Sequence, residues 1–262
     1  MLSEFEISND EYINKKPYPH YYQDNILDEQ FAKELQSEIM NLPIEMFDRY
    51  DNPFEQKYTL RDKNKYPPKL QSLINYLISD VFVSKLSSFT GHQLLVDTTK
   101  NFYGVHMYKE NDKLDIHVDA GIHPVLNLKK QITLGIYLSY NWTYENGCAL
   151  EIWRGEDSHV EKPKIYECVT KIHPMFNRLI LFTCTDNAWH GNPDPVHIEN
   201  NTNSKRIFIT LSYLSNEIDN YNNKRKKAYF IARPNDPEDL NKDKLRELRA
   251  NPETCNLVYR TN

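Results

Sequence analysis

Apolar residues recur at helical spacing in two stretches of the first third of the chain. The first contains Phe31, Leu35, Ile39 and Leu42, and the second contains Leu70, Leu73, Ile74, Leu77, Ile78 and Val81. An apolar residue at every third or fourth position makes one packing face on a helix. Asp28 is an N-cap residue type and Pro43 stops a helix, so the first helix is predicted from Asp28 to about Leu42. Pro67-Pro68 and Gly91 bound the second helical segment.

The pattern changes to short β-rich runs over about residues 93–214. Asn, Asp, Gly and Pro separate the runs, which span 93–98, 102–109, 114–118, 132–139, 148–153, 165–171, 178–184 and 206–214. Eight such runs without intervening helices are typical of a jelly roll, the double-stranded β-helix. The predicted fold class is therefore mainly β, with a jelly-roll core braced by the N-terminal helices. Residues 228–231 predict a further strand, and Asp236-Pro237-Glu238 predicts the start of a helix that reaches about Ala250.

The length of 262 residues suits one substantial core with additions. We expect a helical support segment over residues 1–92, the jelly-roll core over 93–215 and a strand and helix extension over 216–262. All three are expected to belong to one domain.

Charge and cysteine usage exclude several classes of protein. A formal net charge of −5 gives no footprint for nucleic acid, and the one basic run, residues 224–227, is expected to be a solvated loop. Four cysteines without CxxC pairing favour reduced thiols, and with no basic, apolar leader they favour a cytoplasmic location. No stretch approaches the ~20 apolar residues that cross a bilayer, so no membrane association is expected.

The candidate chemistry lies in a His-x-Asp motif, His117-Val-Asp119, and a later histidine, His190. Side chains at positions i and i+2 of a strand point to the same face, so His117 and Asp119 can bind one metal ion together. His190 would complete three ligands. Two imidazoles and one carboxylate form the facial triad of non-haem Fe(II) oxygenases, which leaves open positions for a co-substrate and O2. We therefore predict these three residues as catalytic metal ligands.

Arg206 opens an apolar strand, residues 206–214. An arginine that points inward there is costly unless a carboxylate meets its guanidinium. Thr210 lies on the same strand face and could add a hydroxyl contact. Arg206 and Thr210 are thus candidates for binding an acidic ligand beside the metal.

The surrounding motifs form an ordered series. They are a strand with Tyr137 followed by Asn141-Trp142, then 146–153 (NGCALEIW), 172–182 (IHPMFNRLILF), Trp189-His190-Gly191, and 205–213 (KRIFITLSY). The series, over about residues 100–215, resembles the catalytic domain of the prolyl 4-hydroxylase-like 2-oxoglutarate/Fe(II) dioxygenases. The chain departs from that family's pattern in two places, with Gly147-Cys148 in place of paired glycines and with a longer segment between His190 and Arg206.

The resemblance implies Fe(II) as cofactor, 2-oxoglutarate and O2 as co-substrates, and ascorbate as reductant. Arg206 would hold the C5 carboxylate of 2-oxoglutarate, Tyr137 matches a tyrosine that contacts this co-substrate, and Tyr108 matches one that lines the pocket. The implied reaction is hydroxylation of an unactivated C–H bond, in a prolyl residue or a related substrate, with release of succinate and CO2.

Alternatives remain open for the other histidines and for the substrate. The seven other histidines are expected to be surface or hydrogen-bonded structural residues, with His123 a candidate for contact near the site. The substrate is a peptide, or else a small molecule as in a sugar-pathway oxygenase. A third alternative is a catalytically silent jelly-roll module, which the intact triad and Arg206 disfavour because a structural metal needs no dicarboxylate clamp.

Overall fold

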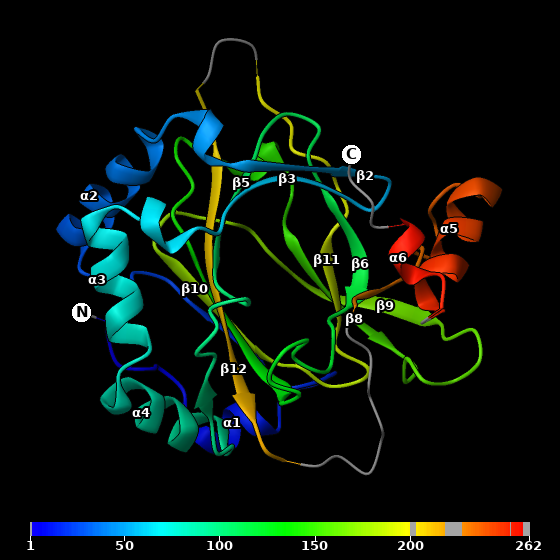
Figure 1. Ribbon diagram of the computed structural model, residues 1–262, viewed down its shortest axis with the longest axis horizontal. Coiled ribbons are helices and arrows are strands. Elements are labelled where there is room, and N and C mark those ends of the chain that lie inside the picture. The colour runs from blue at the N-terminus through cyan, green and yellow to red at the C-terminus, as the bar shows by residue number, and fades with distance from the viewer. Residues whose placement is uncertain (1, 200–202, 218–226, 252, 259–262) are drawn as a thin grey trace.

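A folded antiparallel sheet occupies the centre of the molecule in the computed structural model, which describes residues 2–199, 203–217, 227–251 and 253–258 (Figure 1). Its strands are β1 His20–Gln23, β2 Asp48–Asn52, β3 Glu55–Leu60, β4 Leu95–Val96, β5 Gly104–Tyr108, β6 Leu114–Val118, β7 Lys129–Tyr137, β8 Leu150–Gly155, β9 Ile165–Ile172, β10 Arg178–Thr183, β11 Trp189–Asn192, β12 Arg206–Ser215 and β13 Tyr229–Phe230. The order along the sheet is β1-β10-β7-β12-β5-β3-β6-β11-β8-β9, with β13 beside β6. The sheet curls into a nearly closed barrel, which confirms the predicted jelly-roll class.

Alternating side chains give the strands β7, β10, β12 and β5 two different buried faces. On β7, for example, Leu134 and Ile136 belong to the main apolar core, while Thr133 and Tyr137 face the interior of the barrel. Both faces are covered, so these strands show long apolar runs in the sequence. The outer face packs against helices and the inner face is free to carry polar chemistry.

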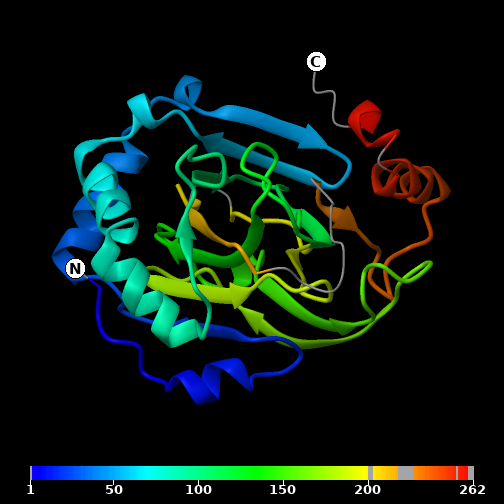
Figure 2. The same ribbon diagram turned by 60° about the horizontal axis from the view of Figure 1, so that its bottom comes forward.

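Helices cover opposite sides of the barrel (Figures 1 and 2). They are α1 Asn9–Ile13, α2 Glu29–Met40, α3 Pro68–Leu77, α4 Asp80–Thr90, α5 Leu240–Ala250 and α6 Cys255–Val258. The group α2, α3 and α4 lies on one side, and α5 and α6 lie on the other (Figure 1). The predicted first helix is confirmed, because the Asp28 carboxylate accepts the N–H of Phe31 at 2.9 Å and α2 follows directly.

The second predicted helical segment is two helices and not one. Ser79 interrupts it, because its hydroxyl accepts the N–H of Phe82 at 3.3 Å and so caps a new helix. Val81, which the pattern assigned to the apolar stripe, is 78 % exposed. Gly91 ends α4 in the left-handed conformation, as its place in the pattern predicted.

The N-terminal third also contains strands that the pattern did not predict. β1 pairs with β10, and β3 joins β5 to β6, so both complete the barrel. Residues of β2 and β3 are largely polar, and their strand structure depends on partner strands far along the chain. The short strand β11 was missed as well.

The C-terminal helix begins later than predicted. Asp236, the predicted cap, does not cap the helix. Its carboxylate accepts hydrogen bonds from the backbone N–H and the guanidinium of Arg233, both at 2.9 Å. Asp239 caps α5 instead, accepting the N–H of Lys242 at 3.0 Å. The predicted strand over 228–231 is present as β13. Of the basic run 224–227, the first three residues lie outside the described residues, and Lys227 is partly exposed and lines the central cavity.

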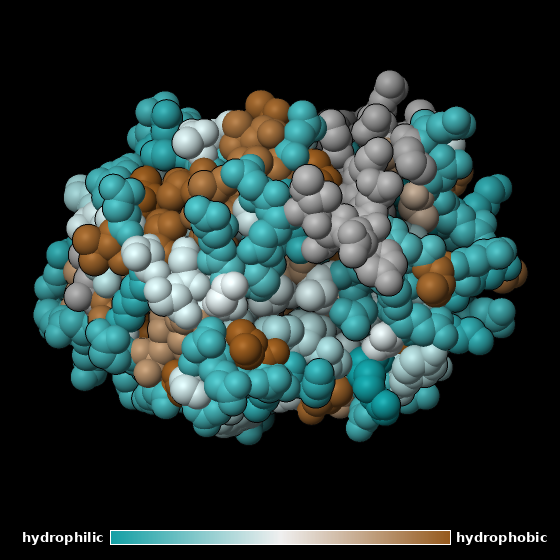
Figure 3. All heavy atoms as spheres, turned by 90° about the horizontal axis from the view of Figure 1, so that it is seen from below, coloured by the Kyte–Doolittle hydropathy of each residue, from teal (hydrophilic) through white to brown (hydrophobic). Residues whose placement is uncertain are grey.

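Polar side chains cover most of the face shown in Figure 3, where apolar side chains gather only in smaller groups. Within the described residues, no helix has the length and apolar character to cross a membrane. None of the four cysteines forms a disulfide bond within the described residues.

Candidate metal and co-substrate site

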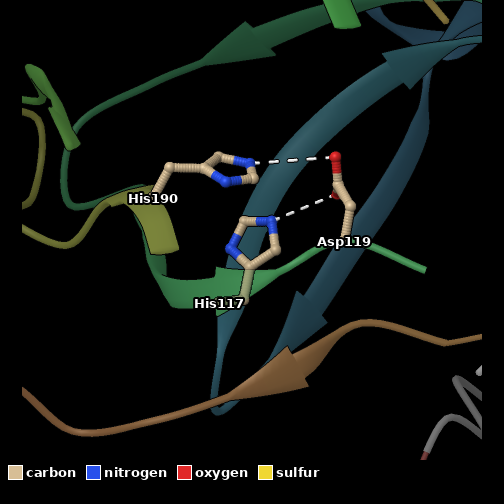
Figure 4. A group of neighbouring side chains, drawn as sticks. All are labelled: His117, Asp119 and His190. Carbon is tan, nitrogen blue, oxygen red and sulfur yellow. Dashed lines mark ion pairs between the residues drawn. The ribbon is translucent and has the colours of Figure 1, made fainter. Parts of the chain in front are cut away.

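The three predicted ligands converge from two neighbouring strands (Figure 4). His117 on β6 stands directly opposite His190 on β11, and Asp119 follows the last residue of β6. His117 Nε2 lies 3.5 Å from Asp119 Oδ1, and His190 Nε2 lies 3.9 Å from Asp119 Oδ2. One potential ligand atom from each residue lies within 4.8 Å of the others. The structure thus brings together the residues that the motif nominated.

Backbone carbonyls orient both imidazoles. His117 Nδ1 lies 2.9 Å from the carbonyl of Asp115, and His190 Nδ1 lies 2.8 Å from the carbonyl of Ala188. A carbonyl can only accept, so each Nδ1 carries the proton and each Nε2 offers a lone pair. Burial and the adjacent His117 lower the pKa of His190 to about 3, which keeps its imidazole neutral. Neutral, oriented imidazoles are the form that binds a metal ion.

Lys130 is a contact of the site that the sequence pattern did not identify. Its Nζ lies 2.5 Å from Asp119 Oδ2. Burial opposes ionisation of Asp119, yet Lys130 and His117 hold the pKa of this carboxyl well below its usual range. The pairing of β7 with β12 skips Gln131, and this bulge turns Lys130 toward the barrel interior. The available signal was the basic pair Lys129-Lys130 shortly before the apolar run 132–139.

His123, a candidate contact in the sequence, stabilises the loop that follows Asp119. Its ring is fully buried, with Nδ1 accepting the N–H groups of Val125 and Leu126 at 3.2 and 3.0 Å. Its Nε2 lies 3.3 Å from Asp97. The ring does not line the central cavity, so of the two roles expected for His123, support of the site and contact with substrate, the structure favours support.

A cavity of 390 Å³ extends from the triad into the barrel. All four residues predicted to bind the co-substrate line it, namely Arg206, Tyr137, Thr210 and Tyr108. Arg206 on β12 stands opposite Tyr108 on β5. Its guanidinium carbon lies 4.3 Å from the ring centre of Tyr108 and 5.0 Å from that of Tyr137. Thr210 also donates to the carbonyl of Leu134 at 3.3 Å.

The guanidinium of Arg206 is buried and incompletely partnered. Arg206 is 2 % exposed, and its Nη2 reaches Tyr137 Oη at 3.3 Å and Asn192 Oδ1 at 3.4 Å. Nε and Nη1 have no hydrogen-bond partner, and no described carboxylate lies within ion-pair distance. A buried cation without an anion is unfavourable. The site therefore fits a carboxylate ligand that supplies the missing acceptors.

Cys148, the second residue of the Gly147-Cys148 pair that replaces the family's paired glycines, lies near Arg206 together with Asn192. Asn192 Nδ2 donates to Cys148 Sγ at 3.1 Å, and Cys148 has a positive φ of 51°. Burial raises the pKa of Cys148 to about 11, so it stays a neutral thiol. Cys148 therefore packs and accepts a hydrogen bond.

His106 contradicts the expectation that it is a surface or hydrogen-bonded structural residue. Its ring lines the cavity from β5, and its nitrogens have no hydrogen-bond partner among the described residues. Lys57 and Arg61 line the same cavity from the β3 side. Local periodicity could not place these three residues at the site, because β3 meets β5 only through long-range pairing.

Comparison with known proteins agrees with this geometry. Residues 103–214, which contain the triad and Arg206, match the model of the 2OG-Fe(II) oxygenase superfamily. This stretch of the chain is a 2OG-Fe(II) oxygenase domain. The family resemblance inferred from the sequence is thereby confirmed, and with it the assignment as an enzyme of the oxygenase class. No curated protein matches the sequence significantly.

Solved structures with the same fold include prolyl hydroxylases. A Pseudomonas putida prolyl-4-hydroxylase is similar with a TM-score of 0.58 and 11 % identity, covering 80 % of this chain and 97 % of the other chain. A Trichoplax adhaerens prolyl hydroxylase, solved with a hypoxia inducible factor peptide fragment, has a TM-score of 0.56 and 17 % identity, covering 79 % and 87 %. A Burkholderia pseudomallei 2OG-Fe(II) family oxidoreductase has a TM-score of 0.54 and 12 % identity, covering 80 % and 92 %. At these identities the likeness concerns the fold.

Proposed function

We propose that this oxygenase hydroxylates an unactivated C–H bond, coupled to conversion of 2-oxoglutarate to succinate and CO2. One atom of O2 enters the product and the other enters succinate. The observation that carries the proposal is the guanidinium of Arg206, buried without a carboxylate in the cavity that also contains the triad. A chain that only held a metal would have no reason to keep this cation unpaired.

The residues that line the site fit both Fe(II) and 2-oxoglutarate. His117, His190 and Asp119 would hold Fe(II) through two Nε2 lone pairs and one carboxylate, which is the donor set of a facial triad. The chemistry that this metal supplies when bound is activation of O2 for decarboxylation of the co-substrate and oxidation of the substrate. Ascorbate is the proposed reductant that restores Fe(II).

The remaining side chains would bind, orient and exclude water. Arg206 and Tyr137 would hold the distal carboxylate of 2-oxoglutarate. Tyr108 packs on the guanidinium and fixes its plane. Apolar residues of the inner face, Leu150, Ile180 and Phe182, line the cavity and limit the access of water.

A prolyl residue or a related peptide group is the proposed substrate. This proposal is supported by two structural neighbours that are named prolyl hydroxylases, one of which was solved with a peptide fragment. The alternative is a small-molecule substrate, as in a sugar-pathway oxygenase. A screen for Fe(II)- and 2-oxoglutarate-dependent gain of one oxygen atom, by mass spectrometry, separates the two.

Succinate formation tests the activity. We expect slow formation by the purified protein alone, stimulated by ascorbate and lost in Asp119→Ala, because O2 can reach an open coordination position before substrate binds. Arg154→Gln is a matched control, since Arg154 is exposed and pairs with Glu167 on the surface. A protein that binds Fe(II) but forms no succinate with any peptide or metabolite would favour the silent module.

Arg206→Ala tests the co-substrate site. A hydrogen bond to a charged group contributes about 1.5–3 kcal/mol, so 2-oxoglutarate affinity should fall by about one to two powers of ten. Iron binding should persist, and Arg206→Lys should recover only part of the affinity because it lacks the planar fork. Titration of the metal-to-ligand absorption band measures this, and an unchanged affinity would remove Arg206 from the site.

A further inference from the structure

The central cavity is strongly basic although the chain is acidic overall. Its lining includes six basic side chains and two carboxylates, the carboxylates being Glu55 and Asp119. The basic residues are Lys57, Arg61, Lys130, Arg206, Lys227 and Arg249. The whole chain has 37 acidic and 32 basic residues. Positive charge is therefore concentrated at the site, where it raises the local concentration of anions.

The oxygenase chemistry does not remove this excess. Fe(II) adds two positive charges and 2-oxoglutarate adds two negative charges, so together they leave the balance unchanged. Lys130 pairs with Asp119 at 2.5 Å. On the β3 side, Glu55 pairs with Lys57 at 3.0 Å and lies 3.9 Å from Arg249. Arg61 lines the same side of the cavity and adds a further positive charge there.

Two of the cations, Lys57 and Arg61, lie near the same aromatic ring, that of Tyr50. Lys57 Nζ lies 5.6 Å and the Arg61 guanidinium carbon lies 4.6 Å from the ring centre of Tyr50. Tyr50 on β2 stands directly opposite Lys57 on β3. Among the described residues, Arg61 has no carboxylate within ion-pair distance. Both cations line the cavity, so an anion in the cavity on this side would be attracted by both.

His106 adds a neutral polar group to the same wall. Burial first, and then the cations Lys57, Arg61, Arg206 and Lys130, lower its pKa well below the ordinary histidine value. The neutral ring has one N–H donor and no partner for it among the described residues. The wall formed by Tyr50, Lys57, Arg61 and His106, here called the β3 wall, thus presents two cations and one neutral donor to the cavity.

We propose that the oxygenase selects an anionic substrate, whose carboxylate or phosphate group binds to Lys57 and Arg61 on the β3 wall with His106 donating a further hydrogen bond. The C–H bond that is oxidised then lies between this anion and the triad. This inference rests on the proposed hydroxylase function and names its substrate class. Both an acidic peptide and a small acid carry the required group.

Matched pairs of compounds test the proposal. Proline-centred peptides with Asp, Asn or Lys at one flanking position form the first arm, and small carboxylic acids and phosphate monoesters with their amides or alcohols form the second. Stimulation of succinate formation and oxygen incorporation are measured with each. We expect the acidic member of at least one pair to be preferred about tenfold, and the arm in which it appears identifies the source of the anion.

Variants at Arg61 locate the contact. Arg61→Gln should raise the KM for the acidic compound about tenfold with little change in kcat, and leave the KM of its neutral partner unchanged. Arg61→Glu should reverse the preference toward the Lys peptide. Arg154→Gln removes one positive charge outside the cavity and is the control for general electrostatic effects.

Equal use of acidic and neutral members, or an acid preference that survives in Arg61→Glu, would overturn the proposal. Complete lack of succinate under all conditions would instead refute the proposed function. In that case, calorimetry measures the affinities of the Asp and Asn peptides for the Fe(II)-loaded protein under anaerobic conditions. Equal affinities would also overturn the proposed preference for an anionic substrate.

Discussion

The ring of Phe208 on β12 occupies the space that a side chain at Gly135 on β7 would need. A Cβ atom at Gly135 would lie 2.1 Å from both Cε2 and Cζ of that ring, whereas carbon atoms pack at about 3.5–4.0 Å. In Gly135→Ala the ring must therefore move by about 1.5 Å or more. Its neighbours are Tyr137, with ring centres 4.7 Å apart, and the guanidinium of Arg206 at 5.7 Å. The displacement is thus transmitted to the co-substrate end of the cavity.

The expected costs follow from this displacement. Overpacking destabilises by about 1–3 kcal/mol, and because Phe208 lines the cavity its ring can turn toward open space, which places the expected cost at the low end; urea unfolding of the metal-free protein would measure it. A misplacement of about 1 Å at a binding group can cost up to about a hundredfold in rate, so kcat/KM for 2-oxoglutarate should fall by about ten- to a hundredfold. Arg154→Gln, at an exposed position outside the cavity, is the control.

A double-mutant cycle tests the cause. Phe208→Leu removes the ring atoms that the new methyl group meets, so the double variant with Gly135→Ala should be more stable than the sum of the single effects by about 1–3 kcal/mol. Strict additivity, or a Gly135→Ala protein as stable as the wild type, would refute the packing described here.

Three further outcomes are expected. Burial opposes ionisation of Glu55, but Lys57 and then Arg249 lower its pKa from 4.5 to about 2. This carboxylate therefore contributes about 3 kcal/mol of stability above pH 4.5, which is lost as pH falls through 2. Glu55→Gln should lower urea stability at pH 7 and flatten this acid loss, and parallel pH profiles for both proteins would contradict the ion pairing. Cys148 should resist iodoacetamide in the folded protein because it is buried with a raised pKa, and mass spectrometry showing labelling as fast as in urea would disprove this. Ser79→Ala should cost about 1 kcal/mol in thermal or urea unfolding with Ser79→Thr nearly neutral, and equal stability of all three proteins would show that the cap is dispensable.

Local sequence determined the strands β4 to β10 and β12 and the motif at the centre of the barrel. Alternation along residues 206–214 placed Arg206 and Thr210 on one face, and the structure has both lining the cavity. His117 and Asp119 are two residues apart, so their proximity needed no knowledge of the rest of the chain. These features depend on spacings of two to four residues, which the backbone of a strand imposes by itself.

Tertiary structure decided which distant side chains share the cavity. Lys130 reaches Asp119 because a bulge in β7 turns it inward. The same cavity is lined by Lys57, Arg61 and His106 because β3 lies between β5 and β6. The polar residues of β3 gave no local pattern from which this strand pairing could be predicted. The division has a physical reason: periodicity sets the face to which a side chain points, but strand order and register, set by long-range packing, decide what that face meets.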